Sequence, residues 1–541
     1  MSDEPIAPSP TAPRPRLALS TAIFALATGL SRIVGLGREV VAASYFGTGG
    51  PASAFTIAAQ IPNLMTNLFA QAALSAAFVP VFTELLQQGR KREAFKLAST
   101  LFWIILIALG ALTAIGILLA GVIMPLFTGP TFNGALDHLT AGLARVLFPV
   151  VLLLGLTGLL VGILQSYDEF SIPALAPAVW NLVILVILVA LHAQFRGGDR
   201  LYAYAIGWLV ATVVQLAMVA SALRRIDFRL QLAVDWHDPR VRQVFVLMLP
   251  VTIGLGIVNL DQLLNSVFGT LVSRQAPRAI DNAFRVYLLP QGMFSVAVAT
   301  VLFPTLSRQA ARRAPAEMRR TLANGMRQIN LLLIPAAALM IVLATPITRL
   351  VFQRGQFNAQ STHLVSVALF WFAFSLPFAG LNLLLTRTFF ALKRPWLPTR
   401  MAGVNILVDI VVSVALYKPL GIAGLVIGTA VANAVMTVLQ LRRMREGFGG
   451  RLQGAQTLMI TVRILVASAL MAAVAFGVWS LLDGLLGRSL PAQVVALGLA
   501  LAAGGALYVR SVLLMAIPEA RQIEALVRGR LGRAEPGAKR R

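Results

Sequence analysis

The sequence predicts an all-α, polytopic membrane protein with about fourteen transmembrane helices. Of its 541 residues, 58% are hydrophobic and only 12% are charged, whereas soluble proteins have an apolar share of roughly 45–50%. Apolar segments recur from Leu17 to Ala516, and each has the roughly 20 residues that a helix needs to cross a hydrocarbon core of about 30 Å. The segments are continuously apolar rather than alternating, which favours helices over the strands of a membrane barrel.

The basic residues predict the topology. Lys and Arg number 46 against 21 Asp and Glu, and they are concentrated in alternate connections, at residues 90–92, 224–242, 308–320, 393–394 and 442–451. Loops rich in Lys and Arg stay on the cytoplasmic side of a membrane, so we expect these connections and both basic termini to be cytoplasmic, which requires an even number of crossings. The charges are spread over loops rather than gathered with stacking aromatics, so nucleic acid is not an expected partner.

Five parts follow one another along the chain. Residues 1–16 are proline-rich and contain Asp3 and Glu4, which is unlike a cleaved signal peptide and predicts a disordered cytoplasmic N-terminus. Residues 17–223 and 240–445 each hold about six apolar helices, which we expect to form an N-lobe and a C-lobe. Residues 458–516 add two helices, interpreted either as packing accessories or as a lipid-binding groove. Residues 517–541 are expected to form a basic cytoplasmic tail along the anionic leaflet.

The two lobes are predicted to be copies of one repeat. Pro80 and Pro304 occur in the similar strings AAFVPVFTE and TVLFPTLSR, 224 residues apart, and Asn181 and Asn405 have the same separation. A repeat of about six crossings returns to the same side of the membrane. The two lobes should therefore have the same orientation and be related by an axis along the membrane normal.

Three arginines lie inside apolar segments, where a guanidinium costs roughly 2.5–3.5 kcal/mol. Arg32 and Arg38 interrupt the first segment and Arg285 interrupts another. Arginine cannot release its proton and forms bidentate bonds to phosphate oxygens, so we expect these residues to face a wet or anion-binding cavity. A bend at the intervening glycines would turn Arg32 and Arg38 into one cavity, and Glu39, which shares a helix face with Arg32, is a further candidate substrate-binding residue. The alternative is that Arg38 and Glu39 form a structural ion pair while Arg32 extends to the interface.

Four further polar residues form a candidate cation site. Asn405 and Asp409 are four residues apart and share a helix face, and Asp261 lies inside another apolar segment. Together with Thr429 these oxygens suit Na⁺ or a pair of protonatable groups. The alternative is that they cross-link helices. The four histidines are scattered, and no two have the spacing of metal ligands.

Asn63 and Gln291 follow Pro62 and Pro290, which predict breaks inside helices. These amides are candidates either for satisfying the freed backbone or for contacting sugars. The chain has no cysteine, no phosphate-cradling loop and no nucleophile motif, so we do not expect an enzyme or an organic cofactor.

Several long strings resemble the MurJ (MviN) family, the lipid II flippases of bacterial peptidoglycan synthesis. These are SRIVGLGREVVAASYFGTGG, RVYLLPQGMFSVAVATVLFPTLS, VFQRGQF and FFALKRPWLP, and the likeness extends over roughly Leu17 to Arg445. The resemblance implies the fold of the MOP exporter superfamily, to which MATE transporters belong, and alternating access in the bacterial inner membrane. It implies that Arg32, Arg38 and Arg285 bind the pyrophosphate of lipid II, and that the candidate cation site matches one known in the family. Expected partners are lipid II, membrane lipids and cell-wall synthesis enzymes.

Some positions depart from the family pattern. Ser53 stands where many members have an acidic residue, Thr66 where they have arginine, and Gln71 and Ala72 where they have Glu-Gly. Because these departures remove charges from the expected cavity, two other functions remain alternatives. One is an ion-coupled drug or polysaccharide-lipid exporter of the same superfamily, and the other is a non-transporting cell-wall scaffold. We expect a monomer by analogy of fold.

Overall fold

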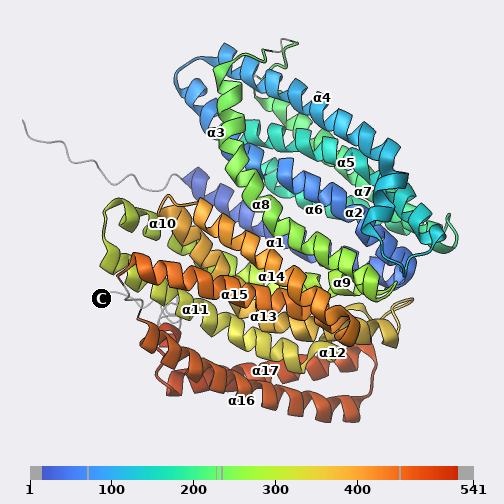
Figure 1. Cartoon of the computed structure of the whole chain (residues 1–541), viewed down its shortest axis with the longest axis vertical. Helices are drawn as coiled ribbons and strands as arrows, with labels where there is room; N and C mark the ends of the chain where they lie inside the picture. Colours follow the sequence, from blue (N-terminus) through green and yellow to red (C-terminus); the bar gives the residue numbers. More distant parts are fainter. Residues whose placement is uncertain (1–14, 70–71, 227, 233–234, 450–452, 522–541) are drawn as a thin grey trace, which may run out of the picture. The chain divides into compact units, whose positions relative to one another are not determined.

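The computed structural model describes residues 15–69, 72–226, 228–232, 235–449 and 453–521 (Figure 1). Within these ranges it contains seventeen α-helices and no β-strand, which confirms the predicted all-α class. The predicted N-terminal segment up to residue 14 and the tail from residue 522 lie outside the described residues.

Eleven helical segments in the described part of the chain are long and apolar enough to cross a membrane. They are α4 with its 3₁₀ end, α5, α6, α7, α9–α10, α11, α13, α14, α15, α16 and α17. The helices α1 and α8 are also long, at 32 and 34 residues, but the structure does not describe many of their side chains. The chain is therefore a multi-pass membrane protein, and the count of about fourteen crossings stays a prediction.

The helices divide into two compact units. Unit 1 consists of α1 (Pro15–Phe46) up to Ala42 and of the segments Ala58–Leu126 and Ala135–Gly256. The last of these segments includes the first half of α8 (Pro239–Val272). Its other helices are most of α2 (Gly50–Phe69), α3 (Ala72–Gln87), α4 (Lys91–Ile123), α5 (Gly134–Ser166), α6 (Ser171–Leu191) and α7 (Leu201–Ala222).

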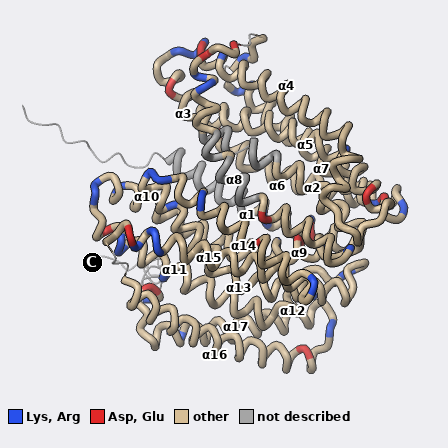
Figure 2. The backbone as a smooth tube through the Cα atoms, viewed as in Figure 1, with Lys and Arg blue, Asp and Glu red and all other residues tan. Residues whose placement is uncertain are grey.

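Unit 2 contains the chain from Ile257 onward and two earlier segments, Ala43–Ile57 and Phe127–Gly134. Its helices are α9 (Ala276–Pro290), α10 (Val296–Ala311), α11 (Pro315–Val342), α12 (Ala344–Phe352), α13 (Ala359–Ala391), α14 (Trp396–Leu420), α15 (Ile422–Gly447), α16 (Gly454–Leu486) and α17 (Leu490–Leu514). The charged residues lie mostly near helix ends, as at the junction of α10 and α11, while the lengths of α13, α16 and α17 are nearly free of them (Figure 2). This distribution is the one expected of helices whose middle turns face lipid or one another.

The internal repeat is also visible in the backbone conformation of the turns that follow equivalent helices. The turn after α3 has its left-handed residue at Gly89, with φ +74°, and the turn after α10 has it at Arg313, with φ +52°. The turn after α5 places Asp168 at φ 61°, and the turn after α13 places Lys393 at φ 56°. Each pair keeps the separation of the repeat, 224 or 225 residues. The two halves therefore end equivalent helices with equivalent turns.

The helices α16 and α17 pack on each other, and α16 also packs on α11 (Figure 1). The chain that follows α17 joins the same core, because Ile517, Glu519 and Ala520 are buried, and both Ile517 and Ala520 pack with Leu331 and Ile464. Residues 517–521 are thus part of unit 2, and the predicted surface tail does not begin at residue 517. The reason is tertiary: α11 supplies Arg327, whose guanidinium binds the Glu519 carboxylate.

Candidate functional site

Arg32 lies on α1 in unit 1 with its side chain exposed. It forms no hydrogen bond or ion pair with any other described residue. Its neighbour Ser31 accepts hydrogen bonds from the amide of Asn181 on α6, at 3.4 Å. Gly35, one turn further on, lies against the same amide, 3.4 Å from the position that a Cβ would take. The helix α1 therefore approaches α6 closely just beyond Arg32 and leaves the Arg32 guanidinium free to contact an anion.

Arg38 is buried, with 5% of its surface exposed, between two tryptophans. Its guanidinium carbon lies 5.1 Å from the centre of the Trp180 ring on α6 and 5.5 Å from that of Trp208 on α7. Glu39, also buried, accepts hydrogen bonds from Arg38 and from the hydroxyl of Tyr204. Cation–π contacts and an ion pair thus compensate the buried charge. This is the ion pair of the alternative interpretation, and in this structure Arg32 and Arg38 face different surroundings.

Arg285 lies on α9 in unit 2, and 30% of its side chain is exposed. Its Nε donates to Asp281 at 3.0 Å, and Arg278 contacts the same carboxylate oxygen at 3.1 Å. Arg285 therefore has an acidic partner one helical turn before it. Two arginines thus share one buried carboxylate oxygen, and part of the Arg285 side chain stays exposed.

The two predicted breaks differ in form. Pro62 lies inside α2, and Asn63 after it is partly buried. After Pro290 the chain forms a π-helical turn, Gln291–Ser295, before α10. Turns of this kind occur often at functional sites because they widen the helix and redirect side chains. Gln291 begins this turn and is partly buried.

Of the positions that depart from the family pattern, the structure describes one side chain. Ser53 is fully buried within unit 2, and its hydroxyl accepts a hydrogen bond from the backbone N–H of Arg278 at 3.3 Å. A carboxylate there would lie close to the Arg278–Asp281 pair. Thr66, Gln71 and Ala72 lie outside the residues whose side chains are described.

The candidate cation site is assembled in unit 2 from α8, α14 and α15. Asp409 is fully buried and contacts both the Asp261 carboxyl and Thr429. Asn265, four residues after Asp261, donates to the Thr429 hydroxyl at 3.0 Å. The fourth predicted ligand, Asn405, is partly buried one turn before Asp409 and forms no hydrogen bond with another described residue.

The chemistry of this cluster suits a hard cation. Three of its buried oxygens, Asp261 Oδ1, Asn265 Oδ1 and Asp409 Oδ2, have no hydrogen-bond partner among the described residues. Two adjacent carboxyls in an apolar bundle are costly unless a cation or proton neutralises them. No group of three His, Cys, Asp or Glu side chains suited to a metal ion occurs in the described part, so oxygens of mixed type would have to supply the ligands.

A glycine permits this close packing. A Cβ on Gly428 of α15 would lie 2.2 Å from the Ser413 hydroxyl and 2.7 Å from Asp409 Oδ1 on α14. Ser413 in turn lies 3.4 Å from Asp409 Oδ1. Only glycine at position 428 lets α15 bring Thr429 beside Asp409.

Sequence reasoning missed several residues that complete these sites. Two of them had a local signal, since Asn265 follows Asp261 and Ser413 follows Asp409 at one helical turn. The aromatic residues around Arg38 had no local signal in the sequence, because Trp180, Tyr204 and Trp208 belong to helices far along the chain.

Comparisons with known proteins point to one family. A family model described as "Lipid II flippase MurJ" matches residues 42–496. The "Probable lipid II flippase MurJ" of Rhizobium tropici is 33% identical over 427 residues, covering 76% of this chain and 78% of that protein. The protein of the same name from Rhizobium meliloti is 31% identical over 450 residues, covering 82% and 83%.

Solved structures show the same fold. One described as "Lipid II flippase MurJ, inward closed conformation" has a TM-score of 0.74 at 21% identity and covers 91% of this chain and all of that one. An inward-facing MATE transporter of the MOP superfamily has a TM-score of 0.66 at 15% identity and covers 80% and 97%. At these identities the likeness concerns the fold alone.

Proposed function

Because this chain belongs to the MurJ family of lipid II flippases, we propose that it moves lipid II from the inner to the outer leaflet of the bacterial cytoplasmic membrane. The match of the family model over residues 42–496 carries this proposal. The protein acts as a transporter rather than as an enzyme, with both termini in the cytoplasm.

The arginines have different roles in this proposal. Arg32 is exposed and Arg285 is partly exposed, so both are available to bind pyrophosphate oxygens. Arg38 is enclosed by Trp180 and Trp208, so it contributes its charge to the pyrophosphate only when that enclosure opens, and otherwise stabilises unit 1.

Transport is coupled to a cation in our proposal. Na⁺, or protons in its place, would bind among Asp261, Asp409 and Thr429, with Asn405 and Asn265 as further oxygen donors. The unpartnered buried oxygens of this cluster support the assignment. A bound cation would neutralise the two carboxyls and hold α8, α14 and α15 together.

Native mass spectrometry of the purified protein tests the substrate. We expect binding of lipid II in preference to the corresponding monophosphate lipid, and a decrease of about 10- to 100-fold for Arg32→Gln and for Arg285→Gln, the range for loss of a charged hydrogen bond. Arg488→Gln, at a position 75% exposed near the start of α17, is the matched control and should bind as the wild type does.

Growth of a strain depleted of its own flippase tests transport. The wild-type chain and Arg488→Gln should restore growth, whereas Arg32→Gln and Arg285→Gln should not. A scaffold would tolerate both arginine changes. Equal binding of pyrophosphate and monophosphate lipids by every variant would exclude a pyrophosphate site and favour a different export substrate.

A further inference from the structure

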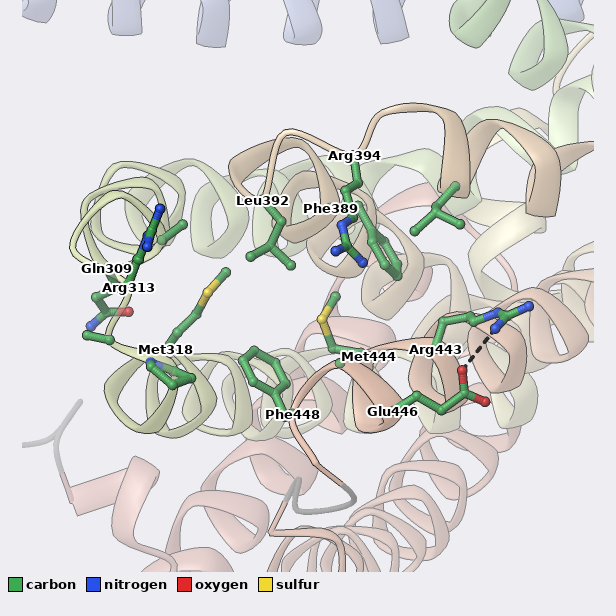
Figure 3. A pocket seen from close by; sticks show the side chains of 15 residues that line it. Gln309, Arg313, Met318, Phe389, Leu392, Arg394, Arg443, Met444, Glu446 and Phe448 are labelled. Carbon is green, nitrogen blue, oxygen red and sulfur yellow. Dashed lines mark hydrogen bonds and ion pairs between the residues drawn. The ribbon is translucent and has the colours of Figure 1, made fainter.

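Unit 2 contains a pocket of about 580 Å³ that the proposed function does not use (Figure 3). It is formed by the ends of α10, α13 and α15 and by the beginnings of α11 and α14. Because all these helices start or end there, the pocket lies where the bundle meets the membrane surface. Its apolar wall consists of Met318, Phe389, Leu392, Leu397, Met444 and Phe448.

The rest of the pocket wall is strongly basic. Arg313, Arg394 and Arg443 line it together with a single acid, Glu446. Arg443 binds Glu446 at 3.0 Å, which Figure 3 shows on the side of the pocket away from Arg313. The guanidinium groups of Arg313 and Arg394 form no hydrogen bond or ion pair with any other described residue. The pocket therefore keeps two uncompensated positive charges above an apolar wall.

The backbone adds to this positive potential. The first residues of α11 and α14 border the pocket, and neither helix has a side chain that caps its N-terminus. Helix N-termini carry a partial positive charge and exposed N–H groups that favour anions.

The corresponding place in unit 1 is filled by the chain itself. Ile226, Phe228, Val241 and Val244, which follow α7, pack there with Leu85, Leu164 and Val219. The basic residues are missing too, since Gly89, Glu169 and Met218 stand at the positions of Arg313, Arg394 and Arg443.

The chain also supplies an anion in unit 1. Asp235 binds Lys96 at 2.7 Å, and this hydrogen bond holds the pKa of the Asp235 carboxyl below its usual range, so it is ionised. In unit 2, α16 begins at Gly454, only a few residues after Phe448, and no described segment fills the pocket. The open pocket thus lacks the apolar filling that unit 1 provides from its own sequence.

We propose that this pocket binds an anionic phospholipid of the cytoplasmic leaflet, with the phosphate between Arg313 and Arg394 and an acyl chain along Phe389, Met444 and Phe448. Basic pockets between helices at the cytoplasmic surface are suited to acidic headgroups. The apolar wall favours a lipid over a free phosphate ion, which would leave that wall exposed. This site is independent of the lipid II site and of its function.

Lipid binding to the delipidated full-length protein, followed by native mass spectrometry, tests the proposal. The probes are phosphatidylglycerol, phosphatidylcholine with the same acyl chains, and glycerol phosphate. We expect one phosphatidylglycerol bound selectively, at least about tenfold more weakly after Arg313→Gln, Arg394→Gln and Arg443→Gln are combined. Arg312→Gln, Arg320→Gln and Arg442→Gln, combined, are the matched control: these residues are exposed, remove the same charge and do not line the pocket.

A second variant blocks the pocket without removing charge. Gly447 lines it, and nothing lies within 4 Å of the position of its Cβ. Gly447→Phe should therefore abolish phosphatidylglycerol binding, whereas Gly454→Phe, at an equally open glycine outside the pocket, should not. A normal unfolding temperature of each variant shows that the fold is intact.

Three outcomes would overturn the proposal. Phosphatidylglycerol binding that survives in both pocket variants would place the lipid elsewhere. Glycerol phosphate that binds as tightly as phosphatidylglycerol would make this a soluble phosphate site. Selective binding of a synthetic peptide of residues 226–237, which contains the Ile226 and Phe228 that pack at the corresponding place in unit 1, with no phosphatidylglycerol binding would show that the occupant is a polypeptide.

Discussion

At the scale of single residues, the buried charges of unit 1 explain why its first helix tolerates an arginine. Arg38 is neutralised by Glu39 and covered by two tryptophans. Its Nε and Nη1 have no hydrogen-bond partner among the described residues, so the aromatic rings are their main compensation. A charged residue enclosed in this way supports the fold whether or not it also meets substrate.

Arg38→Met should destabilise the protein strongly, because it removes the guanidinium that binds the buried Glu39 carboxylate. Breaking one side of a buried pair costs about 3–5 kcal/mol. Changing Glu39→Gln as well removes the charge and keeps an acceptor for the Tyr204 hydroxyl, so the double variant should regain most of that loss. Thermal unfolding of the purified variants measures both effects.

The double variant also separates the two roles of Arg38. If Arg38 binds pyrophosphate, the double variant is stable but binds lipid II weakly in native mass spectrometry. Wild-type affinity of a stable double variant would instead assign Arg38 to the fold alone. Equal stability of single and double variants would contradict the importance of the pair.

At the scale of helices, the fit between α14 and α15 determines the cation site. Gly428 lets the two helices approach until Thr429 meets Asp409. Helices in membranes associate through such small residues, because they gain little from the hydrophobic effect. The site therefore depends on the spacing of two helices as much as on its ligands.

Gly428→Ala should remove stabilisation by Na⁺. We expect NaCl to raise the unfolding temperature of the wild type above its value in KCl, because Na⁺ at roughly ten times its Kd stabilises the folded state by about 1.4 kcal/mol. Gly428→Ala and Asp409→Asn should lose this difference. Gly403→Ala on α14 is the control, since a Cβ there meets no atom within 4 Å. A wild type that responds equally to both salts would exclude a Na⁺ site and leave protonation as the alternative.

At the scale of the whole molecule, the chain after the last helix completes the core of unit 2. Ile517 and Glu519 are 0% and 1% exposed, and the latter binds Arg327 on α11. The two C-terminal helices and the chain after them thus pack on the repeated part through α11, which is the packing role that we considered for residues 458–516. Their alternative role as a lipid-binding groove stays a prediction.

Two truncations should separate this core contact from the tail. Ending the chain after Arg521 keeps every described contact and should leave the unfolding temperature within a few degrees of the wild type. Ending it after Ala516 removes Ile517, whose burial contributes about 1.5–3 kcal/mol to the free energy of unfolding. It also removes Glu519, the carboxylate that binds Arg327. The shorter variant should accumulate poorly and unfold at a clearly lower temperature. Equal stability of both would mean that residues 517–521 contribute nothing to unit 2.

The sequence by itself determined the class of the protein, its repeat and its family. Apolar length, the alternation of basic loops and long strings such as SRIVGLGRE are local properties, and membrane insertion acts on local properties. It also identified Arg32, Arg38, Arg285, Asp261 and Asp409 as exceptional, because a charge inside an apolar segment is visible without a structure.

The tertiary structure decided what surrounds those charges. Contacts between distant segments enclosed Arg38 with Trp180 and Trp208, added Asn265 beside Thr429 and buried Glu519 against Arg327. Sequence spacing cannot predict such contacts, because each depends on how closely two helices approach and on which faces they turn to each other. The sequence therefore determines which charged residues lie inside apolar segments, and the packing of the helices determines which residues contact them.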